Sequence, residues 1–235
     1  AKLNADLETI RSYYLNRGYL EFAVTSTQVT ISPDKQSISI AITVSEGQPY
    51  TVTGVKLEGD FLGREEDFRH LVFLKPGEAY QGEQVANTVR AFSDLFGTYG
   101  YAFARVDSKP DIDRTTGQVV VTFVAEPQRR VYVRKVIISG NSRTRDEVIR
   151  REFRQFESAW YDGQKIKASR DRVERLGYFK DKEVSIDTQE VPGAQDQVDV
   201  LLTVVERPTG AITVGACYSI QTKLSFTGSS GQDNV

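Results

Sequence analysis

The chain has 235 residues but only one cysteine, Cys217, and one histidine, His70. A single cysteine excludes an internal disulfide, which fits the cytosol and equally an oxidising compartment whose proteins do without disulfides. No apolar run approaches the roughly 18 residues that a membrane-spanning helix needs. No signal peptide opens the chain, so we expect its start to be a cut within a longer protein.

Enzymatic chemistry has little support in this composition. His70 follows Arg69 in a short charged segment, and we interpret it as a surface or half-buried helix residue, not a general base. Cys217 has no histidine near it in sequence, which favours a passive thiol. Zinc-ligand spacings, phosphate loops and nucleophile elbows are absent. We therefore predict no enzyme, no cofactor and no metal site, and the net charge of −2 does not indicate a nucleic-acid partner.

The strongest pattern in the chain is a short segment, here called the joint, that recurs at a fixed interval. The segments EGQPY (46–50), EPQRR (126–130) and ERPTG (206–210) each follow an apolar-alternating run. The glutamates of the three joints are 80 residues apart both times (126 − 46 and 206 − 126). A fixed period of this length indicates a string of like modules.

Apolar spacing predicts the same order of elements in each module. The first has a helix over 2–16 and strands over 19–31 and 38–44. The second has a strand over 50–59, helices over 65–72 and 85–99, and strands over 101–113 and 118–126. The third has a strand over 131–140, a helix opened at capping-box spacing by Thr144 and Glu147, a helix over 164–176, and strands over 179–190 and 198–204. Each module contains a Gly-Tyr pair that ends a helix, at Gly18, Gly100 and Gly177.

These elements predict an α+β fold of tandem β-α-α-β-β repeats, each a three-stranded mixed sheet covered on one face by two helices. The first module lacks its opening strand and helix. Sheet edges stay open in such a repeat, and an incoming extended segment can pair with one of them. The candidate edges are the long second strands, over 19–31, 101–113 and 179–190.

The end of the chain has a different pattern. Over 211–220, apolar residues alternate with small or polar ones for ten residues, which is typical of a tilted strand in an outer-membrane β-barrel. Gln221 and Thr222 are expected to turn the chain into a second strand over 223–228. The chain ends at Val235, before a barrel is complete.

Long motifs give the chain a resemblance to a known family. They are LETIRSYYLNRGY (7–19), YVRK (132–135), RREFRQFESAW (150–160), VPGAQDQVD (191–199) and QDN (232–234). With three β-α-α-β-β units before a barrel-like strand, the chain resembles the polypeptide-transport-associated (POTRA) repeats of the outer-membrane barrel assembly family. By that pattern, 1–49 is the C-terminal part of repeat 3, 50–129 is repeat 4, 130–208 is repeat 5, and 209–235 is the truncated start of a β-barrel.

The resemblance implies a function and its partners. The protein would lie in the cell outer membrane of a Gram-negative bacterium, with this region in the periplasm. It would receive unfolded outer-membrane protein precursors and dock accessory lipoproteins, and it would meet the membrane through the missing barrel. The family's docking position for the lipoprotein corresponds to Glu157, and Arg150 corresponds to a neighbouring basic position.

Two observations on the last repeat remain open between a structural and a functional interpretation. Residues 129–154 contain nine basic and three acidic residues, a net charge of +6, so the rest of the chain carries −8. This is either a solvated face or a surface for an acidic partner or anionic headgroups. Phe156 is predicted on a buried helix stripe with Val148, Ile149 and Phe153, and the spacing of Trp160 favours core packing over an exposed binding role.

Two other functions are kept as alternatives. The first is a two-partner secretion or related transporter, which carries similar but fewer repeats. The second is a periplasmic enzyme or glycan-binding module, which predicts a deep pocket with converging polar groups.

Overall fold

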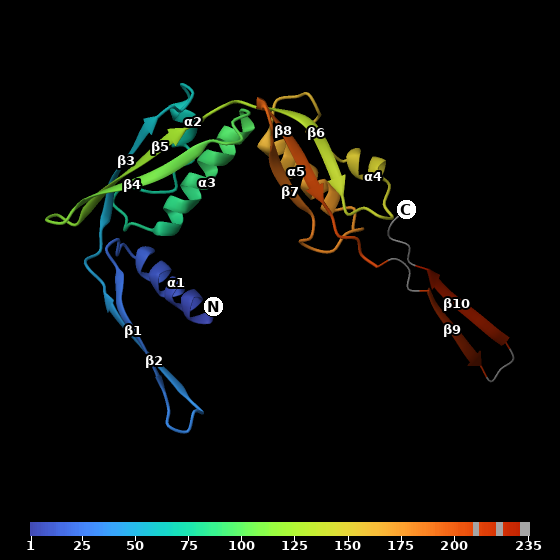
Figure 1. Ribbon diagram of the computed structural model, residues 1–235, viewed down its shortest axis with the longest axis horizontal. Coiled ribbons are helices and arrows are strands. Elements are labelled where there is room, and N and C mark those ends of the chain that lie inside the picture. Colours follow the sequence, from blue (N-terminus) through green and yellow to red (C-terminus); the bar gives the residue numbers. More distant parts are fainter. Residues whose placement is uncertain (209–211, 220–222, 231–235) are drawn as a thin grey trace. The chain divides into compact units, whose positions relative to one another are not determined.

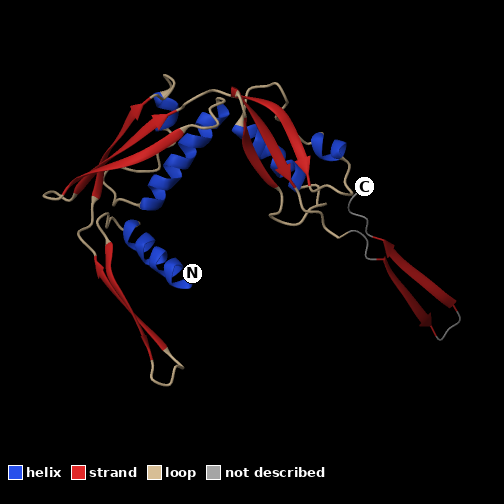
Figure 2. Cartoon of the chain, viewed as in Figure 1, coloured by secondary structure: helices blue, strands red, loops and turns tan. Residues whose placement is uncertain are grey.

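The computed structural model describes residues 1–208, 212–219 and 223–230. The chain divides into two compact units. The first comprises residues 1–95 and 104–128, and the second comprises residues 96–103 and 129–235. Figures 1 and 2 show the elements of each unit.

The first unit opens with α1 (Lys2–Leu15) and an antiparallel hairpin of β1 (Ala23–Ile31) and β2 (Ile38–Ser45). The alternation of β2 predicted a half-buried strand, yet Ile38 is 67% exposed and Ile40 is 46% exposed. That prediction is wrong for these two residues. A two-stranded hairpin with one helix offers too little surface to cover the stripe.

The rest of the first unit, together with the end of α3, forms one complete repeat. It contains β3 (Thr51–Gly59), α2 (Glu65–Arg69), α3 (Gly82–Thr98), β4 (Arg105–Asp113) and β5 (Gln118–Glu126). β5 lies in the centre, parallel to β3 and antiparallel to β4. Phe92 of α3 contacts Phe68 of α2 and Phe123 of β5 edge to face, at centroid distances of 5.3 and 5.4 Å. Both helices therefore pack on the same core as the sheet.

The second unit repeats this topology with β6 (Tyr132–Ser139), α4 (Asp146–Arg150), α5 (Gly163–Glu174), β7 (Ser185–Val191) and β8 (Ala194–Thr203). β8 is central, parallel to β6 and antiparallel to β7. Apolar side chains from both outer helices and from the sheet form one core cluster, which includes Val133, Val136, Ile149, Phe153, Ile166, Val173, Val200 and Leu202.

Both complete repeats confirm the predicted α+β order with a three-stranded mixed sheet and two helices. The first helix of each repeat is shorter than predicted, with only five residues in α2 and in α4. The predicted capping box is wrong, because Arg145 is the N-cap of α4 and makes no side-chain cap bond. Thr144 is instead buried at 2% exposure.

The three Gly-Tyr pairs end their helices as predicted. Gly18, Gly100 and Gly177 have φ values of 92°, 95° and 76°. This left-handed backbone favours glycine because it has no Cβ. At Gly100 an added Cβ would lie 2.9 Å from Cγ of Arg130, so the absence of a side chain there also leaves room for Arg130.

Two further strands follow the last repeat. β9 (Ile212–Ser219) and β10 (Lys223–Ser230) form an antiparallel hairpin. The predicted turn at Gln221 and Thr222 lies outside the described residues, as do Ala211 and Ile220. Across the described ranges, no helix has the length and apolar content to cross a membrane.

Candidate partner-binding site

The outer edge of β6 is paired with a later segment of the same chain. The N–H of Tyr161 donates to the carbonyl of Val131 at 2.9 Å. The N–H of Val133 donates to the carbonyl of Ala159 at 2.9 Å, and the N–H of Ser158 donates to the carbonyl of Val133 at 2.6 Å. Residues 158–161 therefore act as a short fourth strand along the first half of β6.

Glu157 and Arg150 continue this pairing with their side chains. Oε1 of Glu157 accepts a hydrogen bond from the N–H of Val136 at 3.0 Å. Nη1 of Arg150 donates to the carbonyl of Val136 at 3.0 Å and lies 3.5 Å from Oε1 of Glu157. Arg150 is held from its other side by Asp146, at 2.8 Å. The structure thus brings the two sequence-predicted site residues together at one backbone position of an edge strand.

The pair remains accessible from solvent. The side chains of Arg150 and Glu157 are 43% and 49% exposed, while Val136 beneath them is buried at 5% exposure. An ion pair of this exposure contributes little to folding on its own, about 0–1 kcal/mol. Both charged groups can therefore exchange partners without disturbing the core.

Two aromatic residues beside Glu157 are exposed, which corrects two predictions. Phe156 is 67% exposed and Trp160 is 51% exposed, so neither belongs to the core. The short α4 is the reason: it ends at Arg150, and the chain over 152–161 is not helical, so helical spacing does not place side chains there. Trp160 is flanked by Arg130, whose guanidinium lies 4.1 Å from the ring centroid, and by Tyr132, edge to face at 6.3 Å.

The basic stretch at 129–154 is partly neutralised by acids from elsewhere in the repeat. Arg129 pairs with Glu190 at 3.0 Å, and Arg134 pairs with Asp199 at 2.6 Å. Asp199 is 7% exposed, and its hydrogen bonds with Arg134 hold the pKa of its carboxyl below the usual range. The +6 counted in sequence is therefore not an unbroken positive surface.

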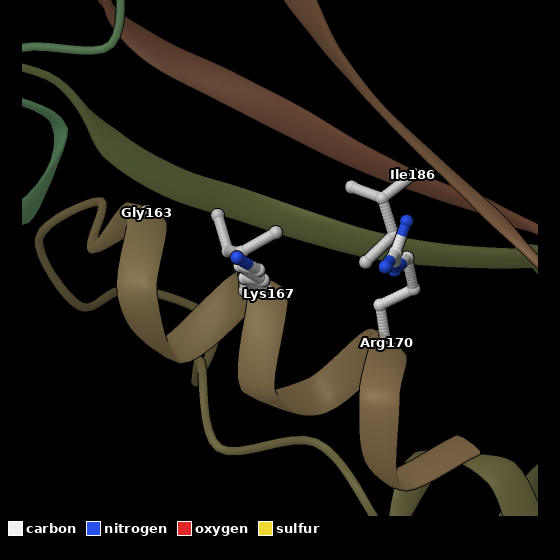
Figure 3. A pocket seen from close by; sticks show the side chains of 5 residues that line it. Gly163, Lys167, Arg170 and Ile186 are labelled. Atoms are coloured by element: carbon white, nitrogen blue, oxygen red, sulfur yellow. The ribbon is translucent and has the colours of Figure 1, made fainter. Parts of the chain in front are cut away.

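A shallow hollow between α5 and β7 is a feature that sequence reasoning missed. It has a volume of about 240 Å³ and is lined by Gly163, Ile166, Lys167, Arg170 and Ile186. Figure 3 shows Lys167 and Arg170 on α5 beside the strand that carries Ile186. When the two repeats are aligned on their equivalent strand bulges, after Val52 and Val133, the places of Lys167 and Arg170 are taken by Ala86 and Val89 in the preceding repeat. Lys167 and Arg170 thus make the rim of the hollow cationic where the preceding repeat has apolar residues. This difference between the aligned repeats is the sequence signal that would have revealed the hollow.

The second strands form the other edges of the two sheets, and they differ. Within the described residues, no strand pairs with the outer edge of β4 or of β7. β4 carries Pro110 in its middle, opposite Val121. Proline has no N–H, and within an edge strand its ring faces away from the partner strand. The outer edge of β4 therefore lacks one donor, while β7 has no proline.

Catalytic or metal-binding groups do not gather at these edges. His70 is an exposed C-cap residue of α2. Within the described part of the chain, no group of three or more His, Cys, Asp or Glu residues is placed to hold a metal ion. Cys217 lies in β9.

Comparisons with known proteins agree with this geometry. The model of the family POTRA, described as "Surface antigen variable number repeat", matches residues 1–47, 50–128 and 131–207. The outer membrane protein assembly factor BamA of Neisseria meningitidis serogroup B is 35% identical over 235 residues, which are 100% of this chain and 29% of that protein. BamA of Buchnera aphidicola is 28% identical over 234 residues, 100% of this chain and 38% of that protein. The chain thus spans about a third of the length of these relatives.

Solved structures give the same result. A crystal structure of Haemophilus influenzae BamA POTRA3-5 matches with a TM-score of 0.81 and 31% identity, over 88% of this chain and 81% of that one. BamA from Haemophilus ducreyi lacking POTRA domains 1–3 matches with a TM-score of 0.61 and 29% identity, over 75% of this chain and 33% of that one.

Proposed function

The chain belongs to the POTRA family, and from that premise we propose that it is the periplasmic scaffold region of an outer-membrane barrel assembly protein. In this proposal, 1–49 ends repeat 3, 50–129 and 130–208 are repeats 4 and 5, and 209–235 begins a membrane barrel. The region binds unfolded barrel precursors and accessory lipoproteins and catalyses no reaction. The observation that carries the proposal is the match of the whole chain, in order, to BamA relatives.

The proposed lipoprotein site is the surface of Arg150, Phe156, Glu157 and Trp160. Two exposed aromatic side chains beside an accessible carboxylate are the composition that protein interfaces favour at their centres. Glu157 supplies the charge that selects and orients a basic group of the partner.

The docking proposal is tested by capture of the accessory lipoproteins with the complete protein in outer membranes. We expect Glu157→Lys to reduce the captured lipoprotein by at least about tenfold, since it replaces an attractive charge by a repulsive one. Glu147→Lys, at an exposed acid on α4, is the matched control and should capture normally. Undiminished capture by Glu157→Lys, with normal folding, removes Glu157 from the site.

The proposed precursor site is the outer edge of β7. Strand addition uses backbone hydrogen bonds and depends little on sequence, which suits a receptor for many precursors. Of the second strands in the two complete repeats, β7 offers every outward donor, and the hollow beside it places Ile166 and Ile186 next to Lys167 and Arg170. β4 is a weaker acceptor because of Pro110.

Amide shifts of the labelled chain on titration with a strand-forming peptide from a barrel precursor test this second site. We expect the largest shifts along 185–191 and smaller ones along 105–113. The same peptide with alternate amides N-methylated is the control, since it cannot form the ladder, and it should not bind. Shifts confined to the helices would show that strand addition is wrong.

A further inference from the structure

The outward backbone groups of Val131, Val133 and Val136 are already bonded within the second unit. The N–H of Val131, just before β6, donates to the carbonyl of Gly100 at 2.9 Å. A bulge between Val133 and Lys135 separates Val133 from Val136. Up to Val133 the partners are backbone groups, and at Val136 they are two charged side chains. In this parallel pair Ser139 faces β8, since its carbonyl accepts from the N–H of Val204 at 3.0 Å. Alternation then places the next outward groups at Ile138.

Two side chains close the β6 edge at Val136, and the carboxylate of Glu157 is the one that has no counterpart in the preceding repeat. The bulge after Val133 corresponds to the bulge after Val52, so the two repeats align at an offset of 81 residues (133 − 52). At this offset Arg69 aligns with Arg150, and Pro76 aligns with Glu157. A proline side chain accepts no hydrogen bond, so the carboxylate of the closure is specific to the last repeat.

We infer that Arg150 and Glu157 form a guard that closes the β6 edge and restricts strand addition in the last repeat to β7. The inference rests on the proposed strand addition. Each side chain replaces one backbone group of an added strand. The carboxylate of Glu157 accepts from the N–H of Val136 as a carbonyl would. The guanidinium of Arg150 donates to the carbonyl of Val136 as an N–H would. Charged side chains at a strand edge also oppose edge-to-edge pairing. Glu157 is then a specificity-determining residue for precursor binding as well as a contact for the lipoprotein.

Because the partners of Val136 are side chains, substitution of Arg150 and Glu157 can open the β6 edge at this position. Substituting both residues by alanine leaves the N–H and carbonyl of Val136 facing outward without a partner, next to those of Ile138. Because both guard residues are about half exposed, their removal takes nothing from the core cluster. The β6 edge then offers the outward groups of Val136 and Ile138 to an added strand, while Val131 and Val133 stay paired with residues 158–161.

The closure itself is tested by hydrogen exchange of the Val136 amide in the full chain. We expect Glu157→Ala to raise the exchange rate of this amide by about tenfold, the loss of one hydrogen bond. Glu157→Gln retains an acceptor oxygen and should protect Val136 as the original residue does. Equal exchange in all three proteins overturns the guard. This comparison needs only single variants, so it shows whether Glu157 protects the Val136 amide even where a double variant folds poorly.

The role in selection is tested with the strand-forming peptide. In the unchanged chain we expect amide shifts along β7 and none at Val136 or Ile138. In Arg150→Ala/Glu157→Ala an additional set of shifts should arise at Val136 and Ile138, with saturation at one more equivalent of peptide than the unchanged chain takes. Arg69→Ala, at the aligned position of the preceding repeat, is the control and should keep the original pattern.

The outcomes separate this inference from the proposed function. Shifts along β7 in both proteins, with none on β6 in the double variant, leave strand addition standing and overturn the guard. Absence of strand shifts in both proteins contradicts strand addition and the guard with it. Concentration-dependent dimerisation of the double variant through β6 supports the guard, with a second copy as the added strand.

Discussion

The carboxylate of Glu206 accepts a hydrogen bond from the backbone N–H of Thr144 at 2.7 Å, across 62 residues of sequence. The same carboxylate accepts from the N–H of Arg143 at 3.0 Å and from the hydroxyl of Ser142 at 2.8 Å. Glu206 follows β8, and the three donors precede α4. One joint glutamate therefore fixes the start of the first helix of the last repeat.

This anchor predicts a pH dependence of stability. Burial raises the pKa of Glu206, but the hydrogen bonds from Thr144, Arg143 and Ser142 outweigh it and lower the pKa to about 2. Since the pKa in the unfolded chain is higher, the stabilisation is complete above pH ~4.5 and is lost as the pH falls toward 2. We expect it to be on the order of 2 kcal/mol, and chemical denaturation between pH 7 and pH 3 measures it.

Glu206→Gln is the direct test of that dependence. It should lower the free energy of unfolding at pH 7 and flatten the decline between pH 4.5 and pH 3. Glu126→Gln, at the exposed glutamate of the preceding joint, is the control and should keep the original profile. An unchanged profile in Glu206→Gln would assign the acid sensitivity to other carboxylates.

Gly140 predicts a second effect, from close backbone contact. It has a φ of 89°, and an added Cβ would lie 2.0 Å from the carbonyl oxygen of Val204. Gly140→Ala therefore combines backbone strain with a clash and should cost about 3 kcal/mol in unfolding free energy. Gly177→Ala has a φ of 76° with nothing within 4 Å, so it should cost only about 1 kcal/mol. Similar losses in both variants would mean that the contact with Val204 relaxes at no cost.

Phe153 and Phe156 predict opposite effects although they are three residues apart. Phe153 is 4% exposed and Phe156 is 67% exposed. Phe153→Ala should cost about 3–5 kcal/mol of folding stability. Phe156→Ala should change stability by less than about 0.5 kcal/mol while it weakens lipoprotein capture. Thermal unfolding and capture, measured on both variants, distinguish the core from the proposed surface.

The joint between the first two repeats predicts a local effect on Tyr50. Arg114 forms two hydrogen bonds to Glu21 through Nη2 and Nε, at 2.8 and 3.1 Å, and Glu21 also accepts from the hydroxyl of Tyr50. The N–H of Tyr50 donates to the carbonyl of Gly18 at 2.8 Å. Because Arg114 is 75% exposed, Arg114→Ala should have only a small effect on overall stability. Faster exchange of the Tyr50 amide would be its signature, and unchanged exchange would show that Gly18 alone holds the joint.

Much of the fold follows from local rules in the sequence. Evenly spaced glutamates at the joints reveal the repeat, while glycines that end helices and period-two apolar runs each depend on residues that are close along the chain. Together they gave the element order and the mixed-sheet repeat, while the long motifs such as RREFRQFESAW (150–160) carried the resemblance to POTRA proteins. Helical periodicity misled at Phe156 and Trp160, because a helix of five residues is too short for its pattern to extend beyond it.

Patterns and motifs that can be read along the chain thus specify the number and order of elements, the α+β repeat and the family. Which charges meet depends on how the chain folds in three dimensions. Glu157 and Arg150 converge on Val136 because the chain over 158–161 pairs with β6, and Glu206 reaches Thr144 because β8 lies parallel to β6. These contacts join residues 14 to 62 positions apart. No local preference encodes them, since they exist only once the core has placed the strands side by side.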